Sequence, residues 1–305
     1  MDKKSLIGII YLIITSMIWG STFVAQYLGG EYVGPYTFVM LRSYIGALFI
    51  FILVLIRNKI NYKKFSYYIK EYEKKDTFKL AVKSSFFLFI GIITQQIGIG
   101  YTTTAKAGFE ASLTIVMVPI IMLFYKKKIK FLTWVFIFLA IYGMYLITTA
   151  SLDKFNIGDV LGIVSSLFYS LSIIQIDNYI DRVDPIKFSM IRILCLGIYS
   201  TFFSLLLERE SFNIINLKMS AFSIIYAGLF SSGIAYTLQI IGQDRVNPII
   251  ATLIMSFEGM FATLSGFIFL HQTLTPIQVV GCILMTFSII MVNVVDILSF
   301  SGVKE

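Results

Sequence analysis

Long apolar runs dominate the chain, and the short segments between them carry most of its charged residues. A hydrocarbon core about 30 Å thick is crossed by roughly 20 helical residues, and about ten runs approach that length. These runs are continuous, whereas the strands of a transmembrane barrel alternate over about ten residues, so a barrel is excluded. The pattern predicts membrane-spanning helices at residues 6–28, 36–56, 80–101, 104–125, 131–150, 157–175, 186–207, 221–241, 248–270 and 276–297.

The composition indicates that these helices belong in a bilayer. Of 305 residues, 57% are hydrophobic and 14% are charged, whereas soluble domains are about half apolar and about a quarter charged. The surface helices of a soluble fold need a polar face, and these runs lack one. The predicted fold class is therefore an all-α polytopic membrane protein with about ten transmembrane helices, and a soluble enzyme is excluded.

The positive net charge is interpreted as a signal of membrane orientation. The chain has 25 Lys and Arg residues against 17 Asp and Glu residues, a net charge of +8. In a soluble protein this balance would suggest nucleic acid as a partner, but in membrane proteins basic residues gather in cytoplasmic loops. With the N-terminus in the cytoplasm, the outer loops hold only Lys106, Lys154, Arg209 and Lys218. The sequence thus predicts that both termini are cytoplasmic, with membrane lipid and no nucleic acid as a partner.

The longest predicted loop, residues 57–79, interleaves basic residues with tyrosine and phenylalanine. Two interpretations stay open for this segment. It lies on the anionic inner leaflet as an interfacial segment, or it is a solvated loop whose charges only enforce topology.

An internal repeat divides the chain into two halves. The pattern Pro-x-x-Phe-x-Met-x-Arg opens the second predicted helix at residues 35–42 and the seventh at residues 185–192. Each half holds five helices, and because five is odd, the two halves have opposite orientations in the membrane. Inverted repeats are a hallmark of secondary transporters, whose substrate sites lie near the bilayer midplane. The predicted domains are the repeats at residues 1–150 and 151–305.

Two arginines occupy matching places in these repeats. Arg42 and Arg192 each lie seven residues beyond a proline that can start a helix, which places them about 10 Å into the membrane. A charge at the centre of a spanning helix costs about 2.5–3.5 kcal/mol or more, so neither side chain is expected to face lipid. Either the pair attracts anionic groups at a central cavity, or each arginine binds loop carbonyls or a carboxylate and fixes a helical hairpin.

Two carboxylates lie within predicted spans. Glu258 follows Pro248 by ten residues, which places it about 15 Å deep and near the midplane. Glu110 lies one helical turn beyond Lys106, on the same face of the fourth helix. A carboxyl group surrounded by apolar side chains can exchange a proton near neutral pH, so either residue is a candidate for proton coupling. The alternative is structural, with Glu110 paired to Lys106 and Glu258 paired to an arginine.

Uncharged polar residues interrupt three of the apolar helices. Polar groups in hydrocarbon must face the bundle interior or a wet cavity. Interhelical hydrogen bonding and contact with a substrate are equally weighted explanations for them. Together with the intramembrane charges, they give a predicted substrate-binding set of Trp19, Thr22, Arg42, Gln96, Glu110, Arg192, Tyr236, Gln239 and Glu258.

Residues for catalysis are missing from the pattern. His271 is the only histidine, so the chain cannot assemble a histidine-rich zinc cluster or a histidine-based triad. The glycines are scattered through apolar helices rather than gathered into a phosphate-binding loop. We therefore predict no catalytic residue, no metal and no cofactor.

Short motifs follow one another in order along both halves. In the first half they are Trp19-Gly20-Ser21-Thr22-Phe23, Gln95-Gln96, Tyr101-Thr102-Thr103, Lys106-Ala107-Gly108-Phe109 and Val118-Pro119. In the second half they are Gly228, Ser231-Ser232-Gly233-Ile234-Ala235-Tyr236, Gln239-Ile240-Ile241-Gly242-Gln243, Ser256-Phe257-Glu258 and Gly281. Nearly the whole chain thus resembles the drug/metabolite transporter superfamily, in its EamA family of ten-helix carriers.

This resemblance implies a multi-pass carrier in the inner or plasma membrane, often an exporter of amino acids or other small metabolites. It also implies a central cavity, lined by helices one, three, four, six, eight and nine, that opens alternately to the two sides. The chain departs from the family pattern at Glu110, where an apolar residue is usual, so its role is expected to be particular to this protein. Residues 6–28 contain no carboxylate, unlike the first helix of four-helix multidrug relatives, which disfavours a simple cation/proton antiporter.

The sequence is interpreted as a secondary transporter, an exporter of a small metabolite such as an amino acid, working by alternating access. Its partner is a small-molecule substrate, and proton coupling and a homodimer both stay open. A membrane-embedded enzyme acting on a lipid-linked substrate would need converging acid, base or metal-binding residues, which the dispersed carboxylates do not supply. A non-transporting scaffold would not need charges inside its membrane helices.

Overall fold

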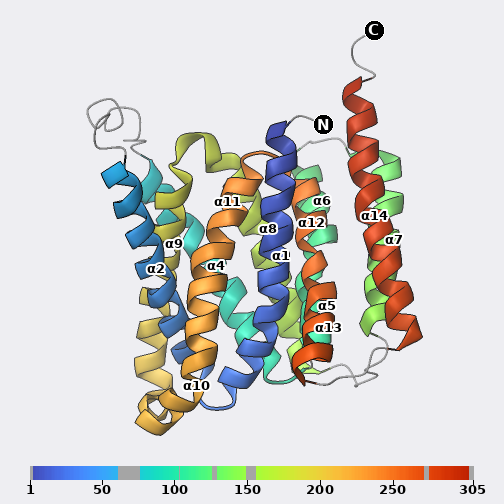
Figure 1. The fold of residues 1–305 in the computed structure, drawn as a ribbon. Helices are drawn as coiled ribbons and strands as arrows, with labels where there is room; N and C mark the ends of the chain where they lie inside the picture. The colour runs from blue at the N-terminus through green and yellow to red at the C-terminus, as the bar shows by residue number, and fades with distance from the viewer. Residues whose placement is uncertain are drawn as a thin grey trace.

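The computed structural model describes residues 3–60, 76–102, 104–125, 129–148, 156–270 and 275–301. This part of the chain is all-helical, as the apolar runs predict, and most helices run roughly along one axis (Figure 1). The first half contains α1 (Lys3–Gly30), α2 (Pro35–Ile60), α4 (Thr77–Ile99), α5 (Thr104–Ser112), α6 (Thr114–Phe124) and α7 (Phe131–Thr148). The second half contains α8 (Ile157–Tyr179), η2 (Ile180–Arg182), α9 (Pro185–Leu207), η3 (Arg209–Phe212), α10 (Ile214–Tyr226), η4 (Ala227–Ala235), α11 (Tyr236–Gln243), α12 (Pro248–Met255), α13 (Phe257–Leu270) and α14 (Pro276–Ser301).

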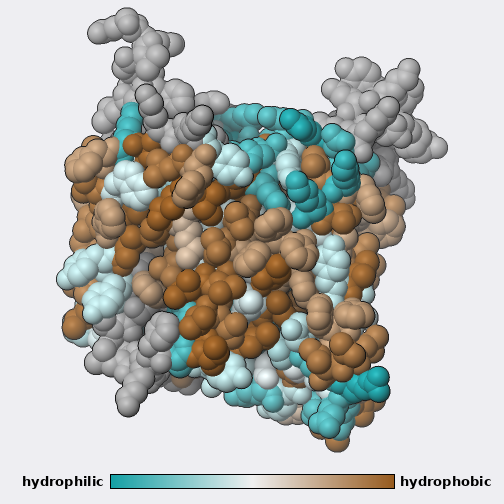
Figure 2. Space-filling model, turned by 180° about the vertical axis from the view of Figure 1, so that it is seen from behind, coloured by the Kyte–Doolittle hydropathy of each residue, from teal (hydrophilic) through white to brown (hydrophobic). Residues whose placement is uncertain are grey.

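Eight helical stretches in the described part of the chain are long and apolar enough to cross a membrane. Two shorter apolar segments, Phe131–Gly143 in α7 and Pro276–Ser288 in α14, lie in helices that pack together at one side of the bundle (Figure 1). On the face shown in Figure 2, apolar side chains form a broad belt, and polar residues gather toward the two ends. Phe202 and Phe222 are among the exposed large side chains. Such a surface suits contact with lipid tails and indicates a multi-pass membrane protein.

The start of α1 and the end of α14 lie at the same end of the bundle (Figure 1). This arrangement agrees with termini on one side of the membrane, and their cytoplasmic location stays a prediction. Most of the loop predicted at residues 57–79 and the single histidine, His271, lie outside the described residues.

Helices α2 and α9 pack against each other and are joined at both ends by carboxylates. Asp184 caps α9 by accepting hydrogen bonds from the first backbone N–H groups of that helix, and it also pairs with Arg57 of α2 at 2.8 Å. At the other end, α2 follows Gly34, which has no side chain to cap it. Glu208, just beyond α9, accepts instead from the backbone N–H of Thr37 at 2.7 Å. Both helix starts therefore satisfy free N–H groups with a carboxylate.

Two helices predicted as continuous are broken near the middle. The break between α5 and α6 is at Leu113, whose N–H bonds to the carbonyl of Glu110, three residues back rather than four. The break between α12 and α13 is at Ser256. The hydroxyl of Ser112 donates to the carbonyl of Ser256 at 3.2 Å, so the two breaks are directly joined. Serine hydroxyls compete with the helix backbone for hydrogen bonds, which explains interruptions without a proline.

The eighth predicted helix begins earlier and is less regular than expected. It starts with α10 at Ile214, seven residues before the predicted position 221. Its centre is the π-helix η4, which packs closely on α2. A Cβ atom at Gly46 would lie 2.5 Å from that of Ser232, and one at Gly228 would lie 2.7 Å from that of Ile45. The two glycines therefore permit the approach, and π-helical turns of this kind often occur at functional sites.

Candidate functional site

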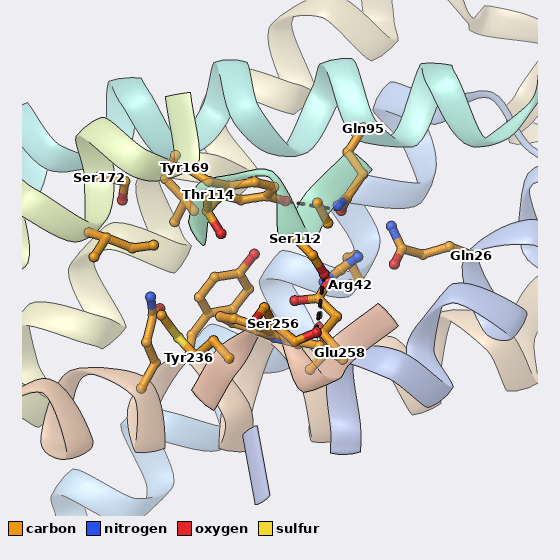
Figure 3. A pocket seen from close by; sticks show the side chains of 17 residues that line it. Gln26, Arg42, Gln95, Ser112, Thr114, Tyr169, Ser172, Tyr236, Ser256 and Glu258 are labelled. Atoms are coloured by element: carbon orange, nitrogen blue, oxygen red, sulfur yellow. Dashed lines mark hydrogen bonds between the residues drawn. The ribbon is translucent and has the colours of Figure 1, made fainter. Parts of the chain in front are cut away.

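A cavity lies inside the bundle, where the broken helices meet the π-helix (Figure 3). It is bounded by elements from both halves of the chain. Small, apolar, aromatic and polar residues all contribute to its wall. The lining residues are Trp19, Gln26, Arg42, Leu88, Gln95, Ala111, Ser112, Thr114, Tyr169, Ser172, Ile173, Ser231, Tyr236, Gln239, Met255, Ser256 and Glu258.

Arg42 is the one cation among these lining residues. Its side chain is only 2% exposed, and Nη2 and Nε donate to the hydroxyls of Ser231 at 2.7 Å and Ser232 at 3.1 Å. Both serines belong to the π-helix, so this distorted segment positions the guanidinium. Hydroxyl groups accept hydrogen bonds without neutralising the charge. The arrangement leaves a positive charge available to an anionic group in the cavity.

Glu258 is the one carboxylate among the lining residues. It lies in the first turn of α13, directly after the break at Ser256, and it is partly exposed. A carboxylate in the first turn interacts favourably with the helix dipole. The ion pairs found among the described residues join Arg57 to Asp184 and Lys106 to Asp159, and Glu258 takes part in neither. The cavity wall thus carries one positive and one negative group.

Aromatic and amide side chains complete the wall. The rings of Trp19 and Tyr236 lie 4.9 Å apart, and the hydroxyl of Tyr169 donates to Gln95 Oε1 at 3.0 Å. Trp19 Nε1 and Gln239 Oε1 are buried and have no hydrogen-bond partner in the described part of the chain. Buried polar atoms usually have partners, so this free donor and free acceptor indicate a wall suited to a polar ligand.

Five of the nine residues predicted as substrate ligands lie on this wall: Trp19, Arg42, Tyr236, Gln239 and Glu258. Their contact with a substrate stays a prediction.

The other four predicted residues lie elsewhere. Thr22 donates to a carbonyl of its own helix, that of Ile18. Arg192 is behind the wall, where Nη2 donates at 2.6 Å to the hydroxyl of Ser172, a lining residue. Glu110 packs against α8, and Gln96 lines a second, outer cavity. Among the described residues, neither arginine hydrogen-bonds to a loop carbonyl or a carboxylate, as one of the two interpretations predicts. Both guanidinium groups donate to serine hydroxyls instead.

Several lining residues were not among the predicted ligands, notably Gln26, Tyr169, Ser172 and Ser231. Gln26 is a lone amide in an apolar helix, which is a signal of the kind that identified Gln96. Tyr169 and Ser172 lie three positions apart and share a helix face, but a tyrosine and a serine in an apolar run have many structural explanations.

A second cavity lies near the ends of α1 and α4. Gln26 belongs to the walls of both cavities. Its Nε2 donates to Gln96 Oε1 at 2.9 Å, and Gln96 Nε2 donates to the backbone carbonyl of Gln26 at 3.3 Å. Both amides are 4% exposed. This amide pair, Gln26 with Gln96, therefore lies between the inner cavity and the outer one.

Replacing Gln96 by alanine is expected to connect the two cavities. Two neutral hydrogen bonds contribute about 1 kcal/mol each, so their loss is expected to raise access about tenfold or more. The measurement is the labelling rate of a cysteine placed at Thr114 by a membrane-impermeant thiol reagent, with Cys195 and Cys282 replaced by alanine.

Gln95→Ala is the matched control, since this neighbouring amide bonds to Tyr169 rather than across to α1. Equal labelling rates in the Gln96→Ala and Gln95→Ala proteins would contradict a barrier formed by the amide pair.

No group of three or more His, Cys, Asp or Glu side chains that could hold a metal ion occurs among the described residues. The polar atoms of the inner cavity instead combine a guanidinium, a carboxylate, amides and hydroxyls. These groups can bind and orient a small polar molecule, and they offer no paired acid and base around a reacting bond.

Comparison with known proteins gives consistent results. The EamA-like transporter family matches residues 6–149 and again residues 156–294. A protein of Archaeoglobus fulgidus named "Uncharacterized transporter" is 30% identical over 295 residues, which cover 95% of this chain and 87% of that protein. A solved structure described only as the crystal structure of a protein superposes with a TM-score of 0.76, at 15% identity and with 96% of each chain covered. The last comparison bears on the fold alone.

Proposed function

Because the chain belongs to the EamA-like transporter family, we propose that it is a secondary transporter that exports a small zwitterionic metabolite, such as an amino acid, from the cell. The observation that carries this proposal is the cavity wall with Arg42 as its one cation and Glu258 as its one carboxylate. The family and the homologue's name point to a transporter rather than an enzyme. The proposed location is the plasma or inner membrane.

The proposed transport path uses two inverted repeats with ten spans in total. Several contacts support this arrangement. The hydroxyls of Thr15 and Ser165, which lie 150 positions apart, donate to carbonyls of the eighth and third spans, those of Ala235 and Gly91. Helix α1 packs on both halves of the ninth span, α12 and α13, as α8 packs on both halves of the fourth span, α5 and α6. Helix α2 pairs with α9, and α7 pairs with α14. In this proposal the cavity lies between the repeats and opens to each side in turn.

The wall suggests how a zwitterion would be held. Its carboxylate would accept hydrogen bonds from Arg42, and a charge-assisted bond of this kind is about twice as strong as a neutral one. Its ammonium group would donate to Glu258 and to the free Gln239 Oε1. The apolar residues Leu88 and Met255 would contact its side chain.

Exchange by proteoliposomes containing the purified protein tests this proposal. We expect counterflow of at least one amino acid, and competition that is at least about tenfold weaker for analogues lacking either the carboxylate or the ammonium group. The matched ligands are an amino acid, the amine without its carboxylate and the acid without its amine. If amino acids, nucleobases and cationic drugs all fail to exchange, the transport proposal is wrong.

Glu258→Gln is expected to remove pH-driven exchange while leaving the protein folded. The amide keeps the size of the carboxyl group but cannot take up or release a proton. The measurement compares substrate flux driven by a pH gradient with flux driven by a substrate gradient alone. Normal pH-driven flux in this variant would leave Glu258 without a role in coupling.

A further inference from the structure

A second group of charged side chains lies between α5 and α8, outside the lining of the inner cavity. Lys106 and Glu110 are one turn apart on α5, and Asp159 lies in the first turn of α8. Lys106 Nζ is 2.6 Å from Asp159 Oδ1, and Asp159 Oδ2 accepts from the backbone N–H of Asn156 at 2.6 Å. Glu110 and Asp159 are 5% and 4% exposed. Three ionisable groups therefore share one buried interface.

The carboxyl group of Glu110 is tightly enclosed. A Cβ atom at position 162 would overlap it, so Gly162 is the part of α8 that admits this side chain. The Glu110 carboxyl also lies within hydrogen-bonding reach of the Asp159 carboxyl, which is one helical turn before Gly162 on α8. Glu110 Oε1 nevertheless has no donor in the described part of the chain. If both groups are ionised, two acceptors face each other with no hydrogen between them.

From this geometry we infer that Glu110 and Asp159 share one proton, and that the pair is a proton-binding site separate from the transport cavity. One ammonium group balances one carboxylate, and the second carboxyl needs a proton to lie buried beside it. With that proton, Glu110 donates to Asp159, while Asp159 keeps its contact with Lys106. The proton then supplies the hydrogen that is otherwise missing between the two buried carboxyl groups.

A proton fits this site better than a metal cation. The Lys106 ammonium group already occupies the cation position at Asp159 Oδ1. Gly162 fills the space on the other side of the Glu110 carboxyl. A sodium ion would need several more oxygen ligands, and it would lie next to the ammonium charge.

Other charged and titratable groups on the surrounding helices do not change the balance between the Lys106 ammonium group and the two carboxyl groups. Helix α5 packs against α8, α13, α7, α1 and α4. The charged residues of α1 and the lysines of α4 lie toward the opposite end of the bundle. Asp177 of α8 and Tyr11 of α1 are on these elements too, Asp177 eighteen positions beyond Asp159 in α8. The other groups on these elements and on the segment before α5 are Glu258 in the cavity wall and the tyrosines Tyr27, Tyr101, Tyr142, Tyr145, Tyr169 and Tyr179.

The proton site is mechanically connected to the transport path, and this step rests on the proposed transport function. Glu110 is followed directly by Ala111 and Ser112 of the cavity wall, and α8 contributes Tyr169 and Ser172 to the same wall. Release of the proton to water would leave two carboxylates facing one ammonium group. Their repulsion would loosen α5 from α8, so occupancy of the site would control how firmly this side of the cavity is held.

Infrared spectroscopy of the protein in lipid nanodiscs tests the inference without any transport measurement. At neutral pH we expect a protonated-carboxyl band from Glu110 that is lost in Glu110→Gln and retained in Glu258→Gln. The same band should be lost in Asp159→Asn, because Glu110 would then pair with Lys106 and ionise. A Glu110→Gln spectrum identical to that of the wild type in this region would overturn the proposal.

Thermal unfolding provides the second measurement. A proton held by the folded protein and released on unfolding makes stability fall as pH rises. The apparent Tm of the wild type should therefore fall by roughly 2–4 °C over the range in which the pair releases its proton, and that of Glu110→Gln should not. Equal pH dependence in both proteins would also overturn the proposal. Failure of all substrates to exchange would count against transport alone, because neither readout depends on it.

Discussion

Replacing Arg42 by alanine is expected to weaken substrate binding about 100-fold while the helices stay folded. Removing one partner of a buried, hydrogen-bonded charge pair costs about 2–5 kcal/mol, and Arg42 is the single cation of the cavity wall. The hydroxyls of Ser231 and Ser232 lose a donor, but they can turn toward other acceptors. The measurement is the Kd of the purified protein for its transported substrate, supported by circular dichroism.

Arg192→Ala is the matched control for this experiment. Arg192 is equally buried and occupies the corresponding place in the repeat, but it is not a lining residue and hydrogen-bonds to the wall through Ser172. Its removal is expected to change Kd by less than about threefold. Loss of binding to the same extent in both variants would mean that the arginines support the structure and that Arg42 has no special part in recognition.

Replacing Gly20 by alanine is expected to be the most destabilising single-methyl change near the cavity. A Cβ atom there would overlap the Cβ of Phe261 and would lie 2.7 Å from the carbonyl oxygen of Glu258 and 2.8 Å from the backbone nitrogen of Ala262. Backbone atoms of α13 cannot move aside individually, so the whole crossing of α1 and α13 must shift. Forced overpacking costs about 1–3 kcal/mol, and we expect an apparent Tm lower by roughly 4–8 °C.

Gly100→Ala is the control for Gly20→Ala. The nearest atom to a Cβ at this position is the carbonyl oxygen of Ile97 at 3.4 Å, and the backbone there has a φ of −67°, which alanine adopts readily. Its Tm is expected to stay within about 1–2 °C of the wild type. Equal Tm values for the two variants would show that the α1–α13 crossing tolerates separation.

Hydrophobic patterning predicted the all-helical membrane fold because it averages over about 20 residues, and lipid imposes its requirement on the same length. The prolines at 35, 185, 248 and 276 also located the starts of four helices. The resemblance to the EamA family, based on short ordered motifs, is confirmed. The approximate positions of the long apolar helices, which depend on a whole span, could thus be predicted from the sequence.

The breaks between α5 and α6 and between α12 and α13 could not be predicted from the sequence, because neither Leu113 nor Ser256, where the helices are interrupted, is a helix-breaking residue. They depend on single hydrogen bonds from other helices. Ser166 donates to the Glu110 carbonyl, and Ser112 donates to the Ser256 carbonyl. Partners 56 and 144 positions away cannot be read from a local pattern.

The polar residues show the same limit. Their position inside apolar runs marked them as interior, yet the sequence could not separate those on the cavity wall from those behind it. Arg42 and Arg192 match in the repeat, but only Arg42 of this pair lines the cavity, where Ser231 and Ser232 of the π-helix bind its guanidinium. The contact of Lys106 with Asp159 joins helices that lie more than 50 positions apart.

The capping of α2 by Glu208 has a consequence for biosynthesis. Gly34 leaves the start of this helix without a cap of its own, and the carboxylate that completes it belongs to a residue more than 170 positions later. By contrast, α9 begins with its own cap, Asp184. A nascent chain that enters the membrane from its N-terminus therefore finishes its second helix only after α9 has been made. The first half, produced alone, would keep that helix end open until a separately supplied second half closed it.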